Sequence, residues 1–426
     1  MSRSLTDSKS KHEVVMDLIN KVADITVKLG VVHQNTQDEV LDGRHITLEG
    51  QRMLYFGSCG YLGLEHDSRL KKGAIEAIQK YGTQFSSSRA YVSSTYYQQA
   101  ESLLSQIFGK PSLLLQSLTV GHTTNITLLV GNDDAIIMDA QVHDSVQNAV
   151  LMLNSRGIHV EVVRHNRLDM LESRIKSLKD SHKKIWYMAD GVYSMQGDFA
   201  PIKELYRLAD QYEQLHLYID DIHGMSWTGP NGGGYVMSQG GFHSRLYLTT
   251  GLTKAFGAAG GLLVFPNEES FKLVKTNGKS FIFSIQMPPM ILGATIESAK
   301  IHLSTEINSI QQDLSQRVAY FNQLSKELGL PLIHDNDSPI RFVGVGKPET
   351  GYNMVRRMMN RGFFFNLSVF PSVSYNRTGL RIPLNRLHTF EDIELLLNEI
   401  AVQLPLALAD SNGSLDEIRK FFRKVA

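Results

Sequence analysis

The segment LHLYIDDIH, residues 215–223, places two acidic residues and a histidine directly after a short apolar run. A run of this length that ends in polar residues is typical of a buried strand in a parallel sheet. The same order recurs three times: AIIM precedes Asp139 and His143, KIWYMA precedes Asp190 and Ser194, and RLYLTT precedes Lys254. Because ligands bind at the carboxyl ends of the strands in an open α/β sheet, we expect these polar residues to share one crevice with Asp220 and His223.

The same alternation indicates how the chain is organised. From about residue 68 to 265, short apolar runs are each followed by a polar turn and a helical stretch, which predicts a large, mostly parallel sheet wrapped by helices. A long helical stretch follows, from about Ile291 to Leu328. After it come strand-like runs at IRFVGVG, GFFFNLSVF and GLRIPLN, a helix at YNMVRRMMNR between the first two, and a final helix from near Phe390. This last part predicts a smaller α+β domain.

Both ends of the chain predict helices. An N-terminal helix is indicated by apolar residues at helical spacing, namely Val14, Leu18, Val22 and Ile25. The tail LDEIRKFFRKVA is basic and amphipathic, which favours a solvated terminal helix over a role at a membrane surface. We therefore expect an N-terminal helix and small-domain segment over 1–60, a large α/β domain over 61–290 and a C-terminal α+β domain over 291–426.

The composition excludes several classes of protein. The 426 residues contain 43 Lys plus Arg and 43 Asp plus Glu, so no net field favours nucleic acid or an acidic surface. Cys59 is the single cysteine, which excludes an internal disulfide and a cysteine-only metal site and fits a reducing, cytoplasmic location. No apolar run approaches the roughly 18 residues of a membrane span. The polar start MSRSLTDSKSKHE lacks the apolar core of a secretory signal.

Lys254 is the only charged residue in TTGLTKAFGAAGG, residues 249–261. Taken alone, the stretch favours a loop lysine whose stem lies on apolar surface while its amine reaches water. The chain shows no zinc-ligand spacing, Walker P-loop or Rossmann glycine fingerprint. A lysine, an aspartate, two histidines and a serine are instead the residue types that suit a pyridoxal 5′-phosphate site. A desolvated lysine has a lowered pKa, so a fraction of it is neutral and can form a Schiff base with the cofactor aldehyde.

The other residues fit parts of the same cofactor. A carboxylate at Asp220 would keep the pyridine nitrogen protonated and make the ring an electron sink. His223 would reach the phenolic oxygen of the ring, and His143 would lie flat against it. The backbone N–H groups of Gly121 and His122, where SLTVGHTTN turns into a helix, would bind the phosphate.

Longer motifs resemble the α-oxoamine synthase family of fold-type-I pyridoxal phosphate enzymes. They are ADGVYSMQGDFAPI (189–202), LYIDDIHGMSWTGPNGGG (217–234) and FIFSIQMPP (281–289), with shorter counterparts at GYLGL, SSSR, VRHNRLDMLE and GLRIPLNRLHT. The resemblance covers about residues 54–400. It implies a fold-type-I architecture, with a large sheet domain and a smaller C-terminal domain.

The resemblance also implies a reaction and residue roles. The family condenses a small amino acid with an acyl thioester, of coenzyme A or a carrier protein, and decarboxylates the adduct to an α-amino ketone. By position, Lys254 matches the Schiff-base lysine, Asp220 the pyridinium partner and His223 the histidine on the phenolic oxygen. His143 matches the ring-stacking histidine, and Ser194 matches the cofactor-contacting serine. Arg381 matches the arginine that pairs with the substrate carboxylate, a role suited to its planar fork. Ser284 falls where a partner subunit reaches the phosphate, which implies a homodimer with shared active sites.

The chain departs from the family pattern at several positions. His122 replaces an aromatic residue in the phosphate-binding turn, which also differs in length. The threonine three residues before the lysine is replaced by Gly251, so that Thr250 and Thr253 are the candidates for its phosphate contact. Two residues that line the family's substrate pocket, an asparagine and a histidine, are replaced by Cys59 and Tyr97. The family's usual substrates are therefore not implied for this chain.

Two other functions remain open at this point. One is an aminotransferase or a carbon–carbon lyase of the same fold, which would use the same lysine and release no coenzyme A. The other is a non-catalytic partner subunit, which is expected to lack the lysine. The presence of Lys254 argues against the second alternative.

Overall fold

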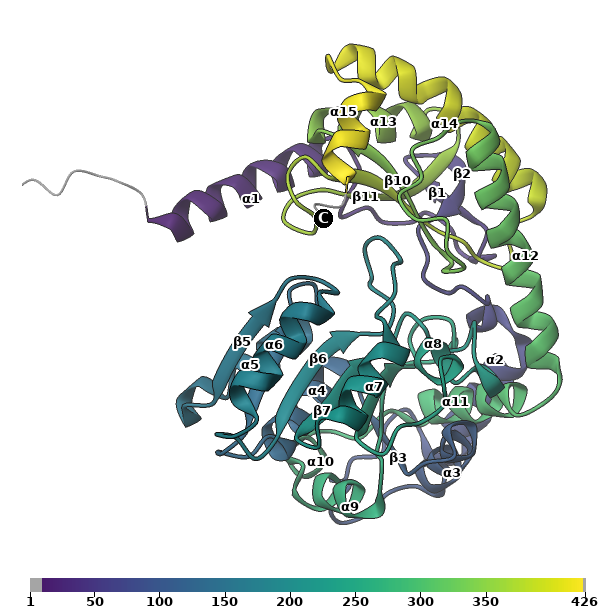
Figure 1. Ribbon diagram of the computed structural model, residues 1–426. Coiled ribbons are helices and arrows are strands. Elements are labelled where there is room, and N and C mark those ends of the chain that lie inside the picture. Colours follow the sequence, from purple (N-terminus) through teal and green to yellow (C-terminus); the bar gives the residue numbers. More distant parts are fainter. Residues whose placement is uncertain (1–9, 424–426) are drawn as a thin grey trace, which may run out of the picture.

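The computed structural model describes residues 10–423, which form a seven-stranded and a five-stranded sheet, each covered by helices (Figure 1). The strand order of the larger sheet is β3 (Ser112–Leu115), β9 (Gly261–Val264), β8 (Leu246–Gly251), β7 (Leu215–Asp220), β6 (Ile185–Asp190), β4 (Ala135–Asp139) and β5 (His159–Val163). Only β9 runs antiparallel to its neighbours in this sheet. The predicted large, mostly parallel sheet is confirmed.

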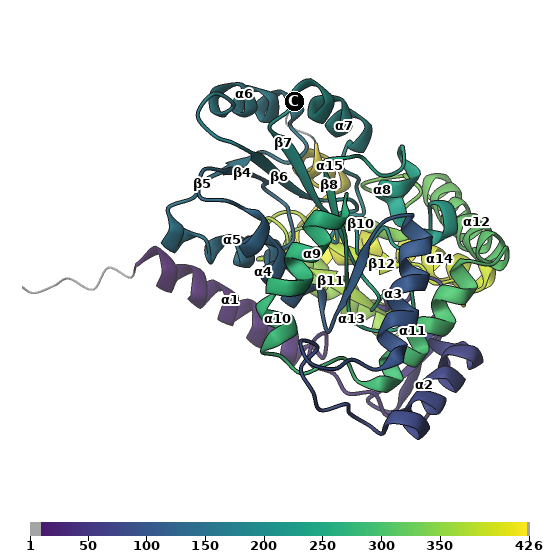
Figure 2. The ribbon, with the colours of Figure 1, turned by 90° about the horizontal axis from the view of Figure 1, so that it is seen from below.

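Both faces of the larger sheet are buried because its strands are apolar on both sides. In β4, Ile136 and Met138 belong to one buried cluster, whereas Ala135 and Ile137 belong to another cluster on the opposite face. The first face is covered by α4 (Leu118–Leu129), α5 (Asp144–Leu151) and α9 (Glu268–Asn277). The second is covered by α6 (Leu168–Leu178), α7 (Ile202–Gln211), α3 (Thr95–Phe108) and α11 (Pro289–His302), and Figure 2 shows the sheet between the two layers. Shorter or peripheral helices are α2 (Ser68–Tyr81), α8 (Gly234–Ser238) and α10 (Lys279–Ile282).

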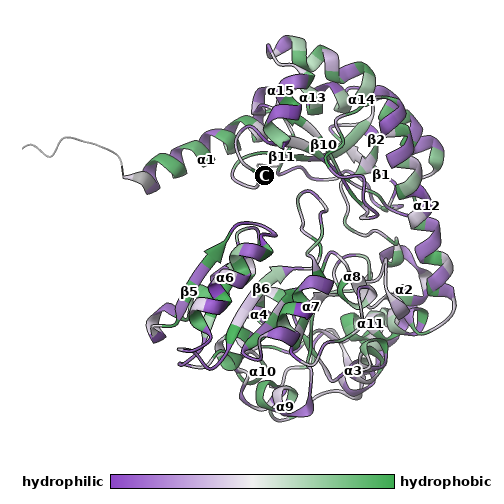
Figure 3. Cartoon of the chain, viewed as in Figure 1, coloured by the Kyte–Doolittle hydropathy of each residue, from purple (hydrophilic) through white to green (hydrophobic). Residues whose placement is uncertain are grey.

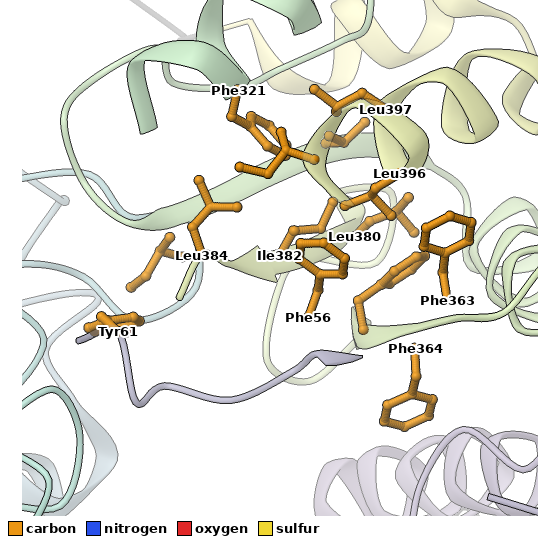
Figure 4. Close-up of a cluster of buried hydrophobic side chains, with 14 of the residues drawn as sticks. Phe56, Tyr61, Phe321, Phe363, Phe364, Leu380, Ile382, Leu384, Leu396 and Leu397 are labelled. Atoms are coloured by element: carbon orange, nitrogen blue, oxygen red, sulfur yellow. The ribbon is translucent and has the colours of Figure 1, made fainter. Parts of the chain in front are cut away.

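The smaller sheet joins the two ends of the chain. Its order is β1 (His45–Leu48), β2 (Gln51–Phe56), β11 (Phe363–Ser368), β12 (Thr378–Pro383) and β10 (Ile340–Gly346). Its helices are α12 (Glu306–Glu327), α13 (Pro348–Met359), α14 (Phe390–Asp410) and α15 (Leu415–Phe422). Figure 4 shows the core of this part, where Phe56, Phe321, Leu380 and Leu396 pack together and Tyr61 lies at the edge. Residues near position 50 thereby share one core with residues near position 390.

The single helical stretch predicted from Ile291 to Leu328 is wrong, because the structure divides it into α11 and α12 at residues 303–305. Helix α11 packs against α2 and α3 of the larger part, whereas α12 contacts α14 of the smaller part. Figure 1 shows α12 running along the side of the molecule toward the smaller sheet. Because the two helices serve different cores, we propose that the boundary between the two larger domains lies at this break rather than at residue 290.

The two terminal helices differ in how they meet the rest of the chain. The predicted N-terminal helix is confirmed as α1 (Lys11–Lys28), which begins with a capping box at Ser10 and Glu13. It projects from the body, with Val14 54% exposed (Figures 1 and 3). The prediction of a solvated C-terminal helix is wrong for one face of α15, where Ile418 is buried against β10. No helix in residues 10–423 is both long and apolar enough to cross a membrane.

Candidate active site

The candidate site lies at the carboxyl ends of neighbouring parallel strands. Asp139, Asp190 and Asp220 are the last residues of β4, β6 and β7, and β8 ends at Gly251, three residues before Lys254. The register of β6 and β7 places Asp190 directly beside Asp220. The sheet therefore gathers side chains from positions 139 to 254 at one edge, as the order of strands and polar residues predicts.

Lys254 is held by His223 and, through it, by Tyr61. The Nζ atom of Lys254 lies 2.5 Å from Nε2 of His223, and Nδ1 of His223 lies 2.7 Å from the Tyr61 hydroxyl. Burial lowers the pKa of Lys254 to about 8, against the attraction of Cys59 and Asp220. Burial and the positive charge of Lys254 lower the pKa of His223 well below its ordinary value. His223 is thus a neutral acceptor for an amine that titrates near neutral pH.

Asp220 is an ionised carboxylate despite its complete burial. The Nε2 atom of His122 donates to Asp220 Oδ2 over 3.1 Å, and the Ile222 N–H donates to Oδ1 over 3.0 Å. Burial alone would raise the pKa of Asp220, but these hydrogen bonds, and that from His122 above all, bring it below the ordinary value. The other ring nitrogen of His122 bonds the Tyr218 hydroxyl over 2.9 Å, which fixes the ring.

Asp190 carries no charge to compete with Asp220. Burial and the neighbouring Asp220 carboxylate raise the pKa of Asp190 well above its ordinary value. Its Oδ1 accepts the His143 N–H over 3.0 Å. The His143 ring, an exposed side chain at the start of α5, bonds the Ser145 hydroxyl over 2.7 Å. Asp190 therefore positions the His143 backbone, and the exposed His143 side chain is accessible to a ligand.

Arg381 reaches the same site from the smaller sheet. Its Nε donates to the Ser194 carbonyl over 2.7 Å, and its Nη2 and Nη1 atoms lie 3.5 and 3.6 Å from Cys59 Sγ. The guanidinium is buried, with 6% of its residue surface exposed. Burial would raise the pKa of the Cys59 thiol, but the charges of Arg381 and Lys254 outweigh it and lower the pKa. Cys59 and Ser194 therefore flank the group that is predicted to bind a carboxylate.

Alkylating Cys59 with iodoacetamide is expected to lower activity about a hundredfold, because the added group would displace a substrate beside Arg381 by an ångström or more. The lowered pKa of the Cys59 thiol increases the fraction of reactive thiolate at a given pH. Peptide mapping and residual activity measure the effect, and the amino acid substrate should protect. A Cys59→Ala enzyme should lose no activity when it is treated with iodoacetamide, whatever its rate before treatment. Full activity after complete labelling would show that Cys59 does not face the substrate.

The prediction that the Gly121 and His122 N–H groups bind phosphate is wrong. Helix α4 begins at Leu118, and the Gly121 N–H already donates to the carbonyl of the N-cap residue Ser117 over 3.1 Å. His122 lies one residue further inside the helix. The N–H groups without an acceptor in the helix are those of Leu118 and Thr119, since Val120 donates to the Ser117 hydroxyl. Gly121 is instead a packing position, where a Cβ would lie 3.0 Å from Leu115.

The structure separates the two threonine candidates. The Thr250 hydroxyl is buried and donates to the Asp221 carbonyl over 3.3 Å. Thr253 is exposed in the turn before Lys254. At Gly251 a Cβ would lie 2.3 Å from the Ile222 side chain, which gives a reason why this position holds no threonine. Thr253 is thus the candidate whose hydroxyl is free to meet a phosphate.

Tyr97 and Ser284 lie outside the group around Lys254. The Tyr97 hydroxyl accepts the Met287 N–H over 2.6 Å, and its ring lies 3.9 Å below the Arg89 guanidinium. No hydrogen bond or ring contact within the described residues links Tyr97 to Lys254 or to the residues around it. The Ser284 hydroxyl donates to Gln116 Oε1 over 2.9 Å, directly before the N-cap of α4.

Sequence reasoning missed three contacts of the site, which involve the side chains of Tyr61, His122 and Asp190. Tyr61 lies in the GYLGL motif, and the motif alone gives no partner for its hydroxyl. The sequence shows His122 as a replacement for an aromatic residue, but its contact with Asp220 joins residues 98 positions apart. Asp190 follows a strand in the sequence, but its raised pKa depends on its burial and on its register with Asp220, neither of which the sequence gives.

These groups fit pyridoxal phosphate. The amine of Lys254 has the lowered pKa that covalent binding of an aldehyde requires. Asp220 offers a buried negative charge for a cationic ring nitrogen. The start of α4 offers free N–H groups, and in the described chain the buried Nε2 of the adjacent Gln116 has no hydrogen-bond partner. Together they provide complementary contacts for the aldehyde, the ring nitrogen and the phosphate.

Comparisons with known proteins agree with this arrangement. Residues 52–400 match the family model of aminotransferases of class I and II. The chain is 30% identical over 387 residues to 8-amino-7-oxononanoate synthase of Thermoanaerobacter pseudethanolicus, covering 90% of this chain and 95% of that protein. It is 29% identical over 355 residues to serine palmitoyltransferase of Sphingobacterium spiritivorum, covering 82% and 86%. The solved serine palmitoyltransferase of Sphingomonas wittichii shares its fold, with a TM-score of 0.83 at 20% identity over 95% of this chain and 99% of that one.

Proposed function

The chain belongs to the aminotransferase class I and II family, and we propose that it is an α-oxoamine synthase, a pyridoxal phosphate-dependent acyltransferase that joins a small amino acid to an acyl thioester. The name of one relative describes a product with an amino group beside a ketone, and that of another describes acyl transfer to serine. The observation that carries the proposal is the grouping of Lys254, Asp220 and Arg381. It combines an amine that titrates near neutral pH, a buried negative charge and a carboxylate-binding fork.

Lys254, Asp220 and the start of α4 would hold the cofactor, with His143 and His223 beside the ring. Pyridoxal phosphate supplies an electron sink that stabilises negative charge at the α carbon of an amino acid. Asp220 contributes a permanent negative charge, because His122 holds it ionised and the neutral Asp190 adds no second charge.

Arg381 orients the amino acid. The Ser194 carbonyl holds Nε, so the two terminal nitrogens remain for a bidentate bond to a carboxylate. Their present neighbour is Cys59 Sγ, at distances longer than those of a carboxylate hydrogen bond. A carboxylate on Arg381 brings the α carbon between the smaller sheet and the strand ends that carry Lys254.

Lys254 moves a proton at its Nζ atom. A pKa of about 8 leaves a fraction of the amine neutral at pH 7, which suits a general base. The neutral His223 accepts a hydrogen bond from the amine and sets its direction, and Tyr61 fixes the ring of His223 in turn. A carboxylate in direct contact would hold the amine protonated, and no ion pair to Lys254 forms within the described chain.

The proposal is tested by incubating the purified protein with a matrix of amino acids and acyl thioesters. Release of free thiol with loss of carbon dioxide is the expected result. Formation of a keto acid without thiol would identify an aminotransferase. Neither reaction with any pair would fit a non-catalytic partner subunit.

We also propose that the protein acts as a homodimer. Ser284 is flanked by two apolar side chains, Phe283 and Ile285, which are 82% and 54% exposed in the single chain. Exposed apolar side chains that lie next to a candidate site suit an interface between subunits. Light scattering tests the assembly, and an active monomer would contradict it.

A further inference from the structure

His165, in the VRHN sequence that follows β5, lies between two carboxylates. Its Nδ1 lies 2.9 Å from Asp139 Oδ1, and its Nε2 lies 2.6 Å from Asp198 Oδ2. Carboxylate oxygens accept hydrogen bonds, so both ring nitrogens donate and the ring is a cation in this arrangement. Burial alone would lower the pKa of His165, but the bonds to Asp139 and Asp198 outweigh it and raise the pKa to about 9.

Asp139 anchors the bridge to the larger sheet. It is the last residue of β4 and is 1% exposed. Its Oδ1 also accepts the Gln141 N–H over 2.8 Å, and its Oδ2 accepts the Asn166 N–H over 2.9 Å and the Tyr187 hydroxyl over 3.3 Å. With these bonds in place, Asp139 cannot follow His165 without breaking contacts to the sheet.

Asp198 lies at the other end of the bridge, in the connection between β6 and α7. This connection is a tight loop, in which the Tyr193 N–H donates to the Asp198 carbonyl over 2.9 Å and the Gly197 N–H donates to the Tyr193 carbonyl over 3.0 Å. The second carboxylate oxygen of Asp198 is buried and has no hydrogen-bond partner in the described chain. His165 is therefore the group that balances the charge of this loop.

The same loop carries the Ser194 carbonyl that accepts Nε of Arg381. The smaller part of the molecule contacts the loop at further points. Asn336 Nδ2 donates to the Gly197 carbonyl over 2.8 Å, His334 Nε2 lies 3.4 Å from Gln196 Oε1, and the Ser368 hydroxyl lies 3.9 Å from Met195 Sδ. The position of the Arg381 guanidinium thus depends on the position of residues 194–198.

We propose that His165 is a positioning residue, which bridges Asp139 and Asp198 and so holds the 194–198 loop where the Ser194 carbonyl orients Arg381 toward the carboxylate of the amino acid. The inference rests on the proposed function, because that carboxylate is the ligand Arg381 would bind. Without the imidazolium, two poorly solvated carboxylates face one another with no cation between them. The loop then moves so that water can hydrate Asp198, and the Arg381 guanidinium loses its hydrogen bond to the Ser194 carbonyl.

The bridge between Asp139 and Asp198 depends on pH, because it requires a protonated His165. The groups that face His165 are Asp139, Asp198, Tyr193, whose ring lies edge-on at 4.3 Å, and Asn166, whose Nδ2 lies 3.2 Å from Nε2. The adjoining cavity of about 830 Å³ is lined by further charged or titratable side chains, those of Arg164, Arg167, His334 and Arg377. Folding raises the pKa of His165 from 6.5 to about 9. The stability that the bridge contributes is therefore complete below pH 6.5 and is lost as the pH rises through about 9.

The test follows exchange of the amino acid α-proton with deuterium in the holoenzyme, without thioester. A His165→Gln variant is expected to need about 10-fold more amino acid for half-saturation, the size of effect seen when an orienting partner is lost, with a smaller change in the maximal rate. His165→Arg keeps a cation that reaches both carboxylates, so it should restore affinity and remove the loss of affinity above pH 9. The matched control is His243→Gln, which breaks a His–Asp pair (3.0 Å) between His243 and Asp210 in another part of the chain.

Hydrogen exchange of the backbone, read by mass spectrometry, supplies a measurement independent of activity. Residues 191–201 should exchange faster in His165→Gln and not in His243→Gln. An unchanged half-saturating concentration, or a fall in maximal rate alone, would overturn the positioning role. If the wild-type enzyme exchanged no α-proton at all, the proposed function would fail, and the loop measurement would still decide whether His165 holds residues 194–198.

Discussion

Replacing Lys254 by arginine is expected to slow exchange of the amino acid α-proton with solvent by about 10²–10⁴-fold, the contribution of a positioned general base. Burial lowers the pKa of the Lys254 amine to about 8, whereas a guanidinium stays protonated at any working pH and cannot accept a proton. Exchange into deuterium, followed by proton NMR without acyl thioester, isolates this step from acyl transfer.

The pH dependence supplies a second check on Lys254. Only the neutral amine accepts a proton, so the wild-type exchange rate is expected to rise as the pH increases through about 8. The arginine variant should show no such rise. Its cofactor content must be measured first, so that a failure to bind pyridoxal phosphate is not mistaken for loss of the base. Exchange at the wild-type rate in a loaded Lys254→Arg enzyme would mean that another group is the base.

Replacing Asp220 by asparagine is expected to lower kcat by about 10²–10³-fold, as is typical when a preorganised electrostatic contact is removed from an active site. The substitution keeps the shape of the side chain and removes the buried negative charge that His122 maintains. Steady-state kinetics with saturating cofactor measure the effect. The KM for the amino acid should change less, because Arg381 binds the carboxylate independently of Asp220.

The next residue in the chain provides a matched control. Asp221 is equally buried, and burial raises its pKa well above the ordinary value, so its carboxyl is neutral before any substitution. Its Oδ2 accepts the Val236 N–H over 2.9 Å, a contact that the carbonyl oxygen of asparagine can keep. Asp221→Asn should therefore stay close to the wild-type rate. Equal losses in the two variants would point to damage of the fold rather than to loss of a charge at Asp220.

The architecture and most of the chemistry at the strand ends can be predicted from the amino-acid sequence alone. Short apolar runs that each end in polar residues predict a parallel sheet, because a strand buried on both faces must be apolar throughout and its first polar residues mark where it leaves the core. The pattern therefore indicates that Asp220, His223 and Lys254 lie at the same edge of the sheet, where the parallel strands have their carboxyl ends. The predicted membership of the α-oxoamine synthase group is confirmed by the family match and the relatives.

The errors fall where a local pattern allows more than one geometry. Residues 291–328 have a nearly continuous helical pattern, but packing against two different cores breaks the helix at 303–305. The expected phosphate contacts at Gly121 and His122 assumed that the helix starts there. Capping by Ser117 starts the helix earlier and uses the Gly121 N–H inside it.

The charge states of the groups at the site, and the residues that hold these groups in place, depend on contacts between distant parts of the chain. His122 meets Asp220 across 98 positions, Tyr61 meets His223 across 162, and Arg381 meets Cys59 across 322. These contacts depend on strand register and on how the smaller sheet closes over the larger one, and no spacing in the sequence encodes either. Protonation also depends on tertiary contacts. Asp190 and Asp220 both end strands, yet burial and the Asp220 charge raise the pKa of Asp190, whereas a hydrogen bond from His122 of α4 lowers the pKa of Asp220.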